Sequence, residues 1–219
     1  MDSMSQQSEE DSYFVRELDI NAGSVLKVNQ CLKGDVGHVV WDAAIVLAKY
    51  LETKAFLKSN GLASKHVLEL GAGTGIVGLV AATLGAHVTL TDLEDLQALL
   101  KKNINVNQSL ISGSATAKVL KWGENASDFL PPPDMILMAD CIYYEQSVGP
   151  LVDTLKTLAG PDTCVLCCYE QRTEGVNPEM ERRFFELLLQ HFSSEEIPAE
   201  QQDPEYNSPD IHLLHLRRL

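Results

Sequence analysis

The sequence is dominated by one stretch, residues 67–78, which reads VLELGAGTGIVG. An apolar run leads into alternate glycines, and a second run of small apolar residues, LVAATL at 79–84, follows them. This order is typical of a buried strand, a tight turn and a helix, because glycine adopts the positive φ angles that such a turn needs. Glycine also lacks a Cβ, so a ligand can approach the backbone where the first N–H groups of the helix are unpaired. The stretch therefore predicts a strand–loop–helix unit that binds a nucleotide or nucleoside.

Two classes of ligand fit this loop. Residues 73–78 match the dinucleotide pattern G-x-G-x-x-G, whereas residues 71–75, with Glu69 before them, resemble the first motif of methyltransferases that use S-adenosylmethionine (SAM). Asp92 ends the next predicted strand, where a carboxylate can accept hydrogen bonds from both hydroxyls of an adenosine ribose. It also suits the N-cap of the helix that follows, and the two roles are compatible. Because NAD and SAM both contain this ribose, Asp92 leaves the choice of ligand open.

The composition predicts one folded domain. The chain has 219 residues, of which 45% are hydrophobic, enough for a full core. Residues 1–12 are polar and acidic and predict a disordered tail, which leaves residues 13–219 as the domain. The net charge of −14 argues against a nucleic-acid partner, which requires a basic face. The same charge fits either a basic protein partner or solubility alone.

The cysteines and the hydropathy predict a cytoplasmic protein with no membrane span. No apolar run approaches the roughly 18 residues that a transmembrane helix needs, and the acidic N-terminus has no signal-peptide pattern. Most cysteines lie in apolar, strand-like runs, which indicates buried, reduced thiols. The five are Cys31, Cys141, Cys164, Cys167 and Cys168. The Cys164–Cys167 spacing lacks a second pair or a histidine partner, and His212 and His215 face opposite sides of a strand, so no metal is expected.

The hydrophobic pattern predicts an α/β fold, a Rossmann-like sheet of seven strands with helices on both faces. After the glycine loop, strands are expected at residues 87–92, 117–120, 134–140, 163–169, 194–197 and 211–216, and helices at 95–107, 147–158 and 177–190. Alternation of strand and helix implies a mostly parallel sheet whose ligand crevice lies at the strand ends. The last two strands are expected to form an antiparallel hairpin at the sheet edge.

Two features precede the glycine loop. Residues 13–18 and 25–28 predict an N-terminal β-hairpin within residues 13–33, outside a plain nucleotide-binding fold. Residues 43–51 predict an amphipathic helix with Asp42 as N-cap, and Asn177 is likewise expected to cap a later helix, with Pro178 at its first position. Trp41, at the entry to the first helix, fits either a cofactor contact or a core position, and the residues alone favour the core.

The end of the fourth core strand carries the sequence DCIYY at residues 140–144. Asp140, Tyr143 and Tyr144 are expected at the mouth of the crevice, where strand ends often carry function. The alternative is a helix cap flanked by aromatic residues of the rim. Trp122 ends the third strand, where an adenine ring would lie, and core packing explains it equally well.

Together these marks resemble the seven-strand SAM-dependent methyltransferases, over about residues 36–219. Residues 40–44, VWDAA, and residues 140–143, DCIY, resemble more narrowly the protein-lysine methyltransferases that carry an Asp/Glu-x-x-Tyr motif. The resemblance implies SAM as cofactor, and Asp140 and Tyr143 as the catalytic residues beside the target lysine. It also implies cofactor contacts at Trp41, Glu69, Gly71, Ala72, Gly73, Asp92, Trp122 and Ala139.

Three runs, residues 41–50, 119–124 and 138–145, are most similar to members of that family that act on a AAA ATPase chaperone, valosin-containing protein. The resemblance therefore implies this protein as the substrate partner, with the enzyme expected to be a monomer. Residues 1–12 and 201–210 match no family motif, so substrate contacts there stay open.

The chemistry of lysine methylation agrees with these residues. The nucleophile is the neutral amine, whereas free lysine has a pKa of about 10.4. Desolvation beside Tyr143 and Tyr144 lowers an amine pKa, and their ring faces stabilise the cation by roughly 0.5–2 kcal/mol. Asp140 favours the charged amine, so we expect it to orient the amine and not to act as general base. Three alternatives stay open: a small-molecule methyltransferase, an NAD-linked oxidoreductase, and a non-catalytic docking protein that binds SAM.

Overall fold

The computed structural model describes residues 13–21, 23–34 and 36–219. The predicted disordered tail, residues 1–12, lies outside the described residues.

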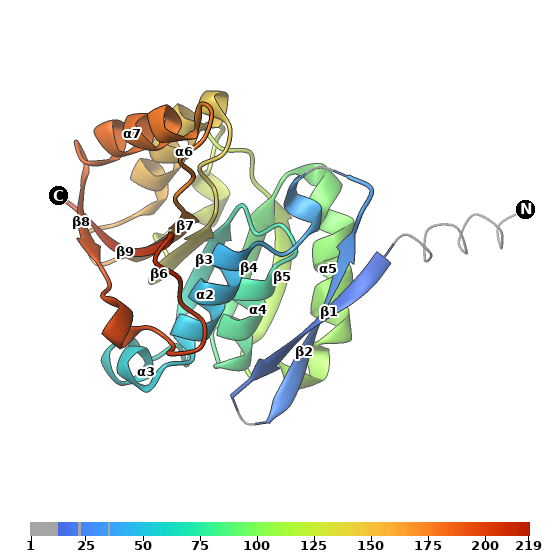
Figure 1. Cartoon of the computed structure of the whole chain (residues 1–219). Helices are drawn as coiled ribbons and strands as arrows, with labels where there is room; N and C mark the ends of the chain where they lie inside the picture. The colour runs from blue at the N-terminus through green and yellow to red at the C-terminus, as the bar shows by residue number, and fades with distance from the viewer. Residues whose placement is uncertain (1–12, 22, 35) are drawn as a thin grey trace, which may run out of the picture.

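A seven-stranded sheet forms the centre of the molecule, with strand order β5-β4-β3-β6-β7-β9-β8 (Figure 1). The strands are β3 (His66–Leu70), β4 (His87–Asp92), β5 (Ser114–Val119), β6 (Met135–Ala139), β7 (Cys164–Glu170), β8 (Phe192–Glu196) and β9 (Ile211–Arg218). Strands β3 to β7 pair in parallel, and β9 is antiparallel to both β7 and β8. This confirms the predicted fold class.

Helices cover both faces of the sheet (Figure 1). They are α2 (Asp42–Leu51), α3 (Lys54–Asn60), α4 (Ile76–Thr83), α5 (Gln97–Val106), α6 (Glu145–Leu158) and α7 (Asn177–Leu188). Neighbouring residues of a strand enter different cores: Leu137 of β6 packs with α2 and α4, whereas Ile136 and Met138 pack with α6 and α7. Burial on both faces explains why β6 reads as a continuous apolar run.

The predicted antiparallel hairpin at the sheet edge is confirmed, with β8 as the edge strand and β9 between β8 and β7. Other predicted boundaries were wrong. Strand β5 begins at Ser114, three residues before the predicted start, because its half-exposed N-terminal half has little apolar signal. Helix α3 was missed, since its seven residues give too few turns for a periodic pattern.

The predicted helix caps were also wrong. Helix α2 has Trp41 as its N-cap residue, and Asp42 is already in the first turn. Helix α7 has Val176 at that position, and Asn177 is its first residue, followed by Pro178. Neither cap residue makes a side-chain capping hydrogen bond. Both helices are therefore held by the packing of their apolar faces.

His212 and His215 face opposite sides of the sheet, as predicted. All five cysteines are free, and Cys167 lies in the core beneath α6 and α7, whereas Cys164 packs on the opposite face. His212 stacks on Tyr169, while His215 lies 3.3 Å from the Cys164 sulfur through Nε2. Within the described residues, no group of three or more potential metal ligands comes together. Over the same part of the chain, no helix is both long and apolar enough to cross a bilayer.

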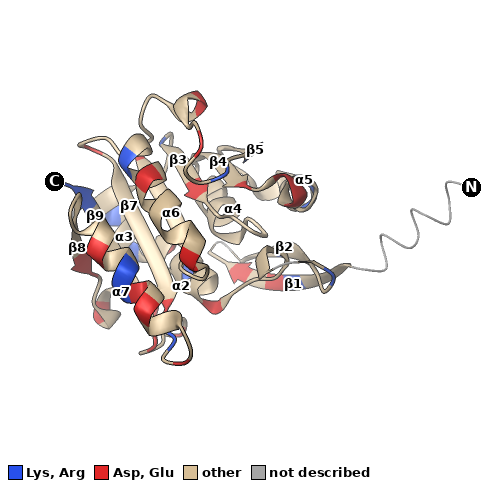
Figure 2. Cartoon of the chain, turned by 90° about the horizontal axis from the view of Figure 1, so that it is seen from above, with Lys and Arg blue, Asp and Glu red and all other residues tan. Residues whose placement is uncertain are grey.

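Acidic side chains are spread over the surface, and basic ones gather toward α7 and the C-terminal strand (Figure 2). Arg182 and Arg183 lie on α7, and Arg217 and Arg218 end β9. Most of the exposed pairs on α7 join Arg182 or Arg183 to Glu179 or Glu186 within one turn. Exposed pairs of this kind contribute little to stability.

The predicted N-terminal hairpin is confirmed and is longer than expected. Strands β1 (Tyr13–Ile20) and β2 (Ser24–Cys31) pair antiparallel, beside α5 (Figure 1). Leu18, Leu26 and Val28 are buried in the core shared with α2 and α4. The hairpin is therefore part of the same folded body as the sheet.

Asn103 of α5 connects this hairpin to the glycine loop. The side chain is fully buried. Its Oδ1 accepts hydrogen bonds from the backbone N–H and the side-chain amide of Asn29, at 2.7 and 2.9 Å. Its Nδ2 donates to the backbone oxygens of Asn29 and Thr74, at 3.0 and 2.9 Å. The amide thus satisfies polar groups of β2 and of the loop that follows β3.

We expect Asn103→Ala to lower the free energy of unfolding by about 3 kcal/mol, because it leaves several buried polar groups without a partner. For a chain of this size that corresponds to a Tm lower by roughly 6–12 °C. Thermal unfolding followed by circular dichroism measures the change. Asn105→Ala, at an exposed position of the same helix, is the matched control. Equal Tm values for the two variants would contradict a bridging role for Asn103.

Candidate active site

The glycine loop packs so tightly that Gly71 and Gly73 have no room for a side chain. Gly71 and Gly73 have positive φ angles of 60° and 54°, which favour glycine. A Cβ at Gly73 would lie 2.9 Å from the backbone oxygen of Gly37, and a Cβ at Gly71 would lie 2.9 Å from the indole ring of Trp122. The loop therefore needs glycine at both positions to bring its backbone to the crevice.

Glu69, the acid before the loop, is buried and forms a hydrogen bond with the first turn of α4. Its Oε2 accepts a hydrogen bond from the Gly78 N–H at 2.9 Å. A Cβ at residue 78 would lie 2.5 Å from that oxygen, so glycine is required there too. Burial raises the pKa of the Glu69 carboxyl to about 8, although the Gly78 hydrogen bond opposes the shift. The carboxyl group also lines the cavity described below.

This raised pKa predicts a pH-dependent stability. The folded chain keeps the Glu69 proton up to about pH 8, whereas the unfolded chain loses it near pH 4.5. Stability therefore falls as the pH rises through this window, by up to about 1.4 kcal/mol per pH unit. Glu69→Gln keeps an acceptor for Gly78 and cannot ionise, so its unfolding free energy in urea should decline less between pH 5.5 and 7.5. Glu17→Gln, an exposed change, should follow the wild type. Parallel curves for wild type and Glu69→Gln would contradict the burial argument.

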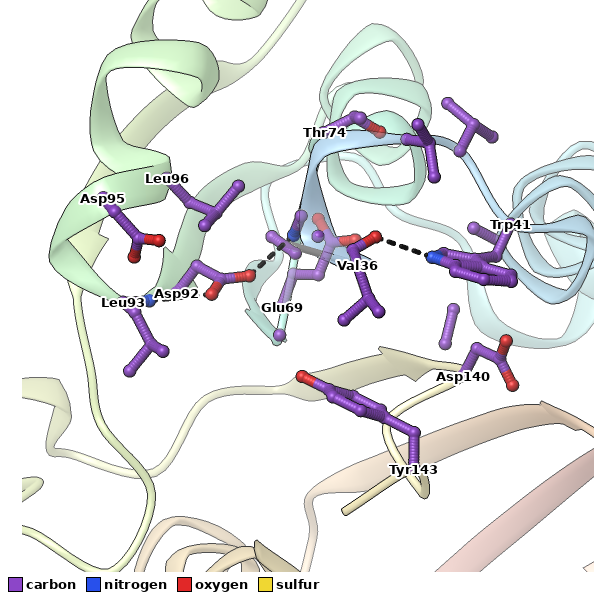
Figure 3. A pocket seen from close by; sticks show the side chains of 18 of the residues that line it. Val36, Trp41, Glu69, Thr74, Asp92, Leu93, Asp95, Leu96, Asp140 and Tyr143 are labelled. Carbon is purple, nitrogen blue, oxygen red and sulfur yellow. Dashed lines mark hydrogen bonds between the residues drawn. The ribbon is translucent and has the colours of Figure 1, made fainter. Parts of the chain in front are cut away.

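Asp92 joins the ends of two strands (Figure 3). Its Oδ2 accepts a hydrogen bond from the Gly73 N–H and its Oδ1 accepts one from the Leu93 N–H, both at 2.7 Å. The predicted N-cap role is wrong, since Leu93 caps the short 3₁₀ segment Glu94–Leu96 and Leu96 caps α5. Burial raises the pKa of the Asp92 carboxyl, and the two backbone hydrogen bonds oppose this shift.

The predicted site residues surround two neighbouring cavities. Nine of them line a cavity of about 840 Å³: Trp41, Glu69, Gly71, Ala72, Gly73, Asp92, Ala139, Asp140 and Tyr143 (Figure 3). Trp122 lines a second cavity of about 760 Å³, which shares Gly71, Asp92, Leu93 and Tyr143 with the first. The two cavities therefore meet at the ends of β3, β4 and β6.

The two tryptophans differ in their surroundings. Trp41 is 39% exposed, so the core position that the residues alone favoured is wrong. Its Nε1 donates a hydrogen bond to the Val36 oxygen at 2.9 Å, which holds the ring at the cavity wall. Trp122 was expected either at the adenine end of the crevice or in the core. It packs against the core beneath α6 and also lines the second cavity.

Asp140 has an unusual backbone conformation directly after β6. Its φ angle is 54°, and its N–H donates to the Cys168 oxygen at 2.8 Å. Its Oδ1 accepts a hydrogen bond from the Glu170 N–H at 3.3 Å, and its Oδ2 accepts one from Arg172 at 2.5 Å. Because α6 begins only at Glu145 with Tyr144 as N-cap, the alternative of a helix cap at Asp140 is wrong.

The aromatic residues after Asp140 lie together at the mouth of the crevice. The rings of Tyr143 and Tyr144 are 4.7 Å apart, tilted by 59°. Figure 3 shows the Tyr143 side chain extending across the cavity between Asp140 and Asp92. Tyr144 is 39% exposed and lines the second cavity. The structure thus brings a carboxylate and two phenol rings to one opening.

Sequence reasoning missed several residues of the cavity wall, of which Arg172 is the most important. It lies in the loop after β7, contacts Asp140, and holds its guanidinium 5.2 Å from the Trp41 ring centre. The only sequence signal was its place at the end of a strand neighbouring β6. Other missed wall residues come from three places: the segment before α2 (Val36, Gly37 and Val39), the glycine loop (Thr74) and the segment after β4 (Leu93, Asp95 and Leu96).

Solved methyltransferases share this fold. The T. thermophilus 16S rRNA methyltransferase RsmC, solved with AdoMet and guanosine, superposes with a TM-score of 0.63 at 16% identity, covering 94% of this chain and 51% of that one. The glycopeptide N-methyltransferase MtfA, solved with SAM, gives a TM-score of 0.59 at 15% identity, covering 78% of this chain and 93% of that one. Such identities establish the fold alone. The chain therefore shares its fold with methyltransferases that were solved with AdoMet or SAM bound.

Sequence comparison narrows the class to a family. A family model described as lysine methyltransferase matches residues 20–191. Protein N-lysine methyltransferase METTL21A of Danio rerio is 41% identical, covering 81% of this chain and 76% of the relative. EEF1A lysine methyltransferase 3 of Xenopus tropicalis is 34% identical, covering 84% of this chain and 80% of the relative. The chain therefore belongs to the lysine methyltransferase family, and it is a SAM-dependent protein-lysine N-methyltransferase.

The residues present fit this cofactor. The glycine loop and Asp92 line the same cavity, and Asp92 places an acidic acceptor beside the loop. Membership of the family resolves the choice between NAD and SAM in favour of SAM. It also rules out the alternatives of an oxidoreductase and of a docking protein without activity.

Proposed function

We propose that this enzyme methylates a lysine of a AAA ATPase chaperone, valosin-containing protein, with Asp140 and Tyr143 beside the target amine. The observation that carries the proposal is that these two side chains line the same cavity as the glycine loop and Asp92. The similarity of residues 41–50, 119–124 and 138–145 to enzymes that act on this chaperone supports the choice of substrate.

In this proposal the cofactor occupies the two joined cavities. Asp92 accepts hydrogen bonds from the ribose hydroxyls, and Trp122 packs against the adenine ring. The other cofactor contacts are Trp41, Glu69, Gly71, Ala72, Gly73 and Ala139, which line the larger cavity. When bound, SAM supplies a methyl group activated by its sulfonium charge.

Residues of the chain then desolvate and orient the target lysine. Tyr143 and Tyr144 surround the side chain with ring faces, which desolvate it and lower the amine pKa. The Asp140 carboxylate accepts a hydrogen bond from an amine N–H and so aims the lone pair. Because a carboxylate favours the protonated amine, Asp140 orients the nucleophile and does not remove its proton. Alignment of this kind supplies much of the rate in group transfer.

We also propose that residues 13–219 act as one domain and that the enzyme is a cytoplasmic monomer. One chain supplies both cavity walls, so the site needs no partner subunit. Five free thiols fit a reducing compartment. Size-exclusion chromatography with light scattering tests whether the enzyme is a monomer, for which a mass of 24.1 kDa is expected.

The substrate is tested by incubating the enzyme and SAM with purified valosin-containing protein and, in parallel, with purified EEF1A. Mass spectrometry of the digested acceptors then locates any methylated lysine. We expect methylation of valosin-containing protein only, and none when Asp140→Ala replaces the wild type. Methylation of EEF1A in its place would refute the proposed substrate and leave the lysine methyltransferase activity intact.

A further inference from the structure

Arg172 provides a positive charge in a cavity wall that otherwise carries carboxylates. One guanidinium nitrogen lies 2.5 Å from Asp140 Oδ2 and 3.3 Å from Glu170 Oε2, while the guanidinium carbon lies 5.2 Å from the Trp41 ring centre. The Arg172 side chain is 26% exposed, and that of Asp140 is 6% exposed. An aromatic face on one side and a buried carboxylate on the other thus hold the guanidinium in place.

Two charged side chains and three thiols surround the Asp140 carboxyl. Arg172 and Glu170 face it from β7 and the loop that follows. The thiols of Cys141, Cys167 and Cys168 also surround it, and burial raises their pKa, to about 12 for Cys167, so they are neutral at pH 7. Burial raises the pKa of the Asp140 carboxyl as well, and the Arg172 guanidinium opposes that shift. Arg172 is therefore the positive charge among these groups, and it is paired with the carboxylates of Asp140 and Glu170.

This ion pair matters for the incoming lysine, because methyl transfer requires a neutral amine. An unpaired Asp140 carboxylate would stabilise the ammonium and so suppress the nucleophile. A carboxylate that is already paired with Arg172 can still accept a hydrogen bond, since each oxygen has two lone pairs. The guanidinium charge also repels a second cation nearby, which further disfavours the ammonium.

We propose that Arg172 is a positioning residue that holds Asp140 in an ion pair and thereby favours the neutral form of the target lysine amine. The inference rests on the proposed function, in which Asp140 contacts that amine. The lysine ammonium releases one proton to solvent, and the freed lone pair forms the new N–C bond. The electrons of the broken C–S bond remain on the sulfur, so charge and atoms balance.

The test is the pH dependence of kcat/KM for wild type, Arg172→Gln and Arg172→Lys, on the acceptor protein that the wild type labels. In Arg172→Gln the amine loses its cationic neighbour and faces an unpaired carboxylate, so the rising limb of the profile should move up by about one pH unit. At pH 7.5 this gives about tenfold lower activity, which returns toward the wild-type value at high pH. Arg172→Lys keeps the charge but loses the planar group that lies over Trp41, so its profile should lie between those of wild type and Arg172→Gln.

The controls separate the possible failures. Arg182→Gln removes an exposed arginine of α7 and should leave the profile unchanged. An equal loss for Arg172→Gln at every pH would overturn the inference in favour of a purely structural role. A gain in activity would overturn it in favour of Arg172 as a barrier to substrate. A wild-type enzyme that labels no protein would refute the proposed function itself, whereas an active wild type with an unshifted Arg172→Gln profile refutes only the inference.

Discussion

Replacing Asp140 with alanine is expected to reduce kcat about 1000-fold while SAM affinity stays within a few fold. Asp140 faces the proposed lysine position, and the residues proposed to hold SAM lie mainly on the neighbouring loops after β3, β4 and β5. The change removes the acceptor that aims the amine, and losses of about 10²–10³ are typical when one preorganised polar group is removed from an active site. Single-turnover assays with labelled SAM measure the rate, and calorimetry measures the affinity.

The variant must be separated from a folding defect, because Asp140 has a positive φ angle and is paired with Arg172. Asp140→Asn tolerates this φ angle better than alanine and keeps an oxygen acceptor, so it should retain more of the fold and part of the activity. Asp162→Ala, at an exposed turn, should behave as wild type. A parallel loss of SAM binding and activity in Asp140→Asn would contradict an orienting role and indicate a structural one.

Asp92→Asn is expected to weaken SAM binding about 100-fold. Both carboxylate oxygens accept backbone N–H groups, from Gly73 and Leu93. An amide has one oxygen and one NH₂ group, so one of these N–H groups would meet a donor. The variant also loses the charge that strengthens hydrogen bonds from ribose hydroxyls, each worth roughly 1.5–3 kcal/mol to a charged acceptor. Isothermal titration with SAM measures the change.

Glu94→Gln is the matched control, since Glu94 is exposed two residues further along the chain. It should bind SAM with the wild-type affinity. If Asp92→Asn bound SAM as tightly as this control, the ribose contact would have to be assigned to another residue.

Local signals explain why much of the fold was predictable. The glycine loop, the hairpin and the parallel strands each follow from residues close together in the chain, as in residues 67–78, where an apolar run precedes alternate glycines. The predicted strand ends also brought Asp92 and Asp140 to one edge, because parallel strands end on the same side of a sheet. Nine of the ten predicted site residues line one cavity as a result.

The missed features depend on contacts between distant segments. Arg172 contacts Asp140 across 32 positions of sequence, and nothing in its own loop distinguishes it from a solvated arginine. Asn103 bridges β2 and the glycine loop from α5, in a stretch that reads as an ordinary polar helix. Trp41 is 39% exposed at the cavity wall, where the guanidinium of Arg172, from a loop far along the chain, lies over its ring. Tertiary contacts decide all three positions.

The most direct test of the account is to incubate the purified chain with radiolabelled SAM and a cytosolic extract, beside the Asp140→Ala variant. The account predicts one labelled band, at the size of a subunit of valosin-containing protein, that is absent with the variant and carries its label on lysine. Label on small molecules with none on protein would contradict it, as would an equal signal from wild type and variant.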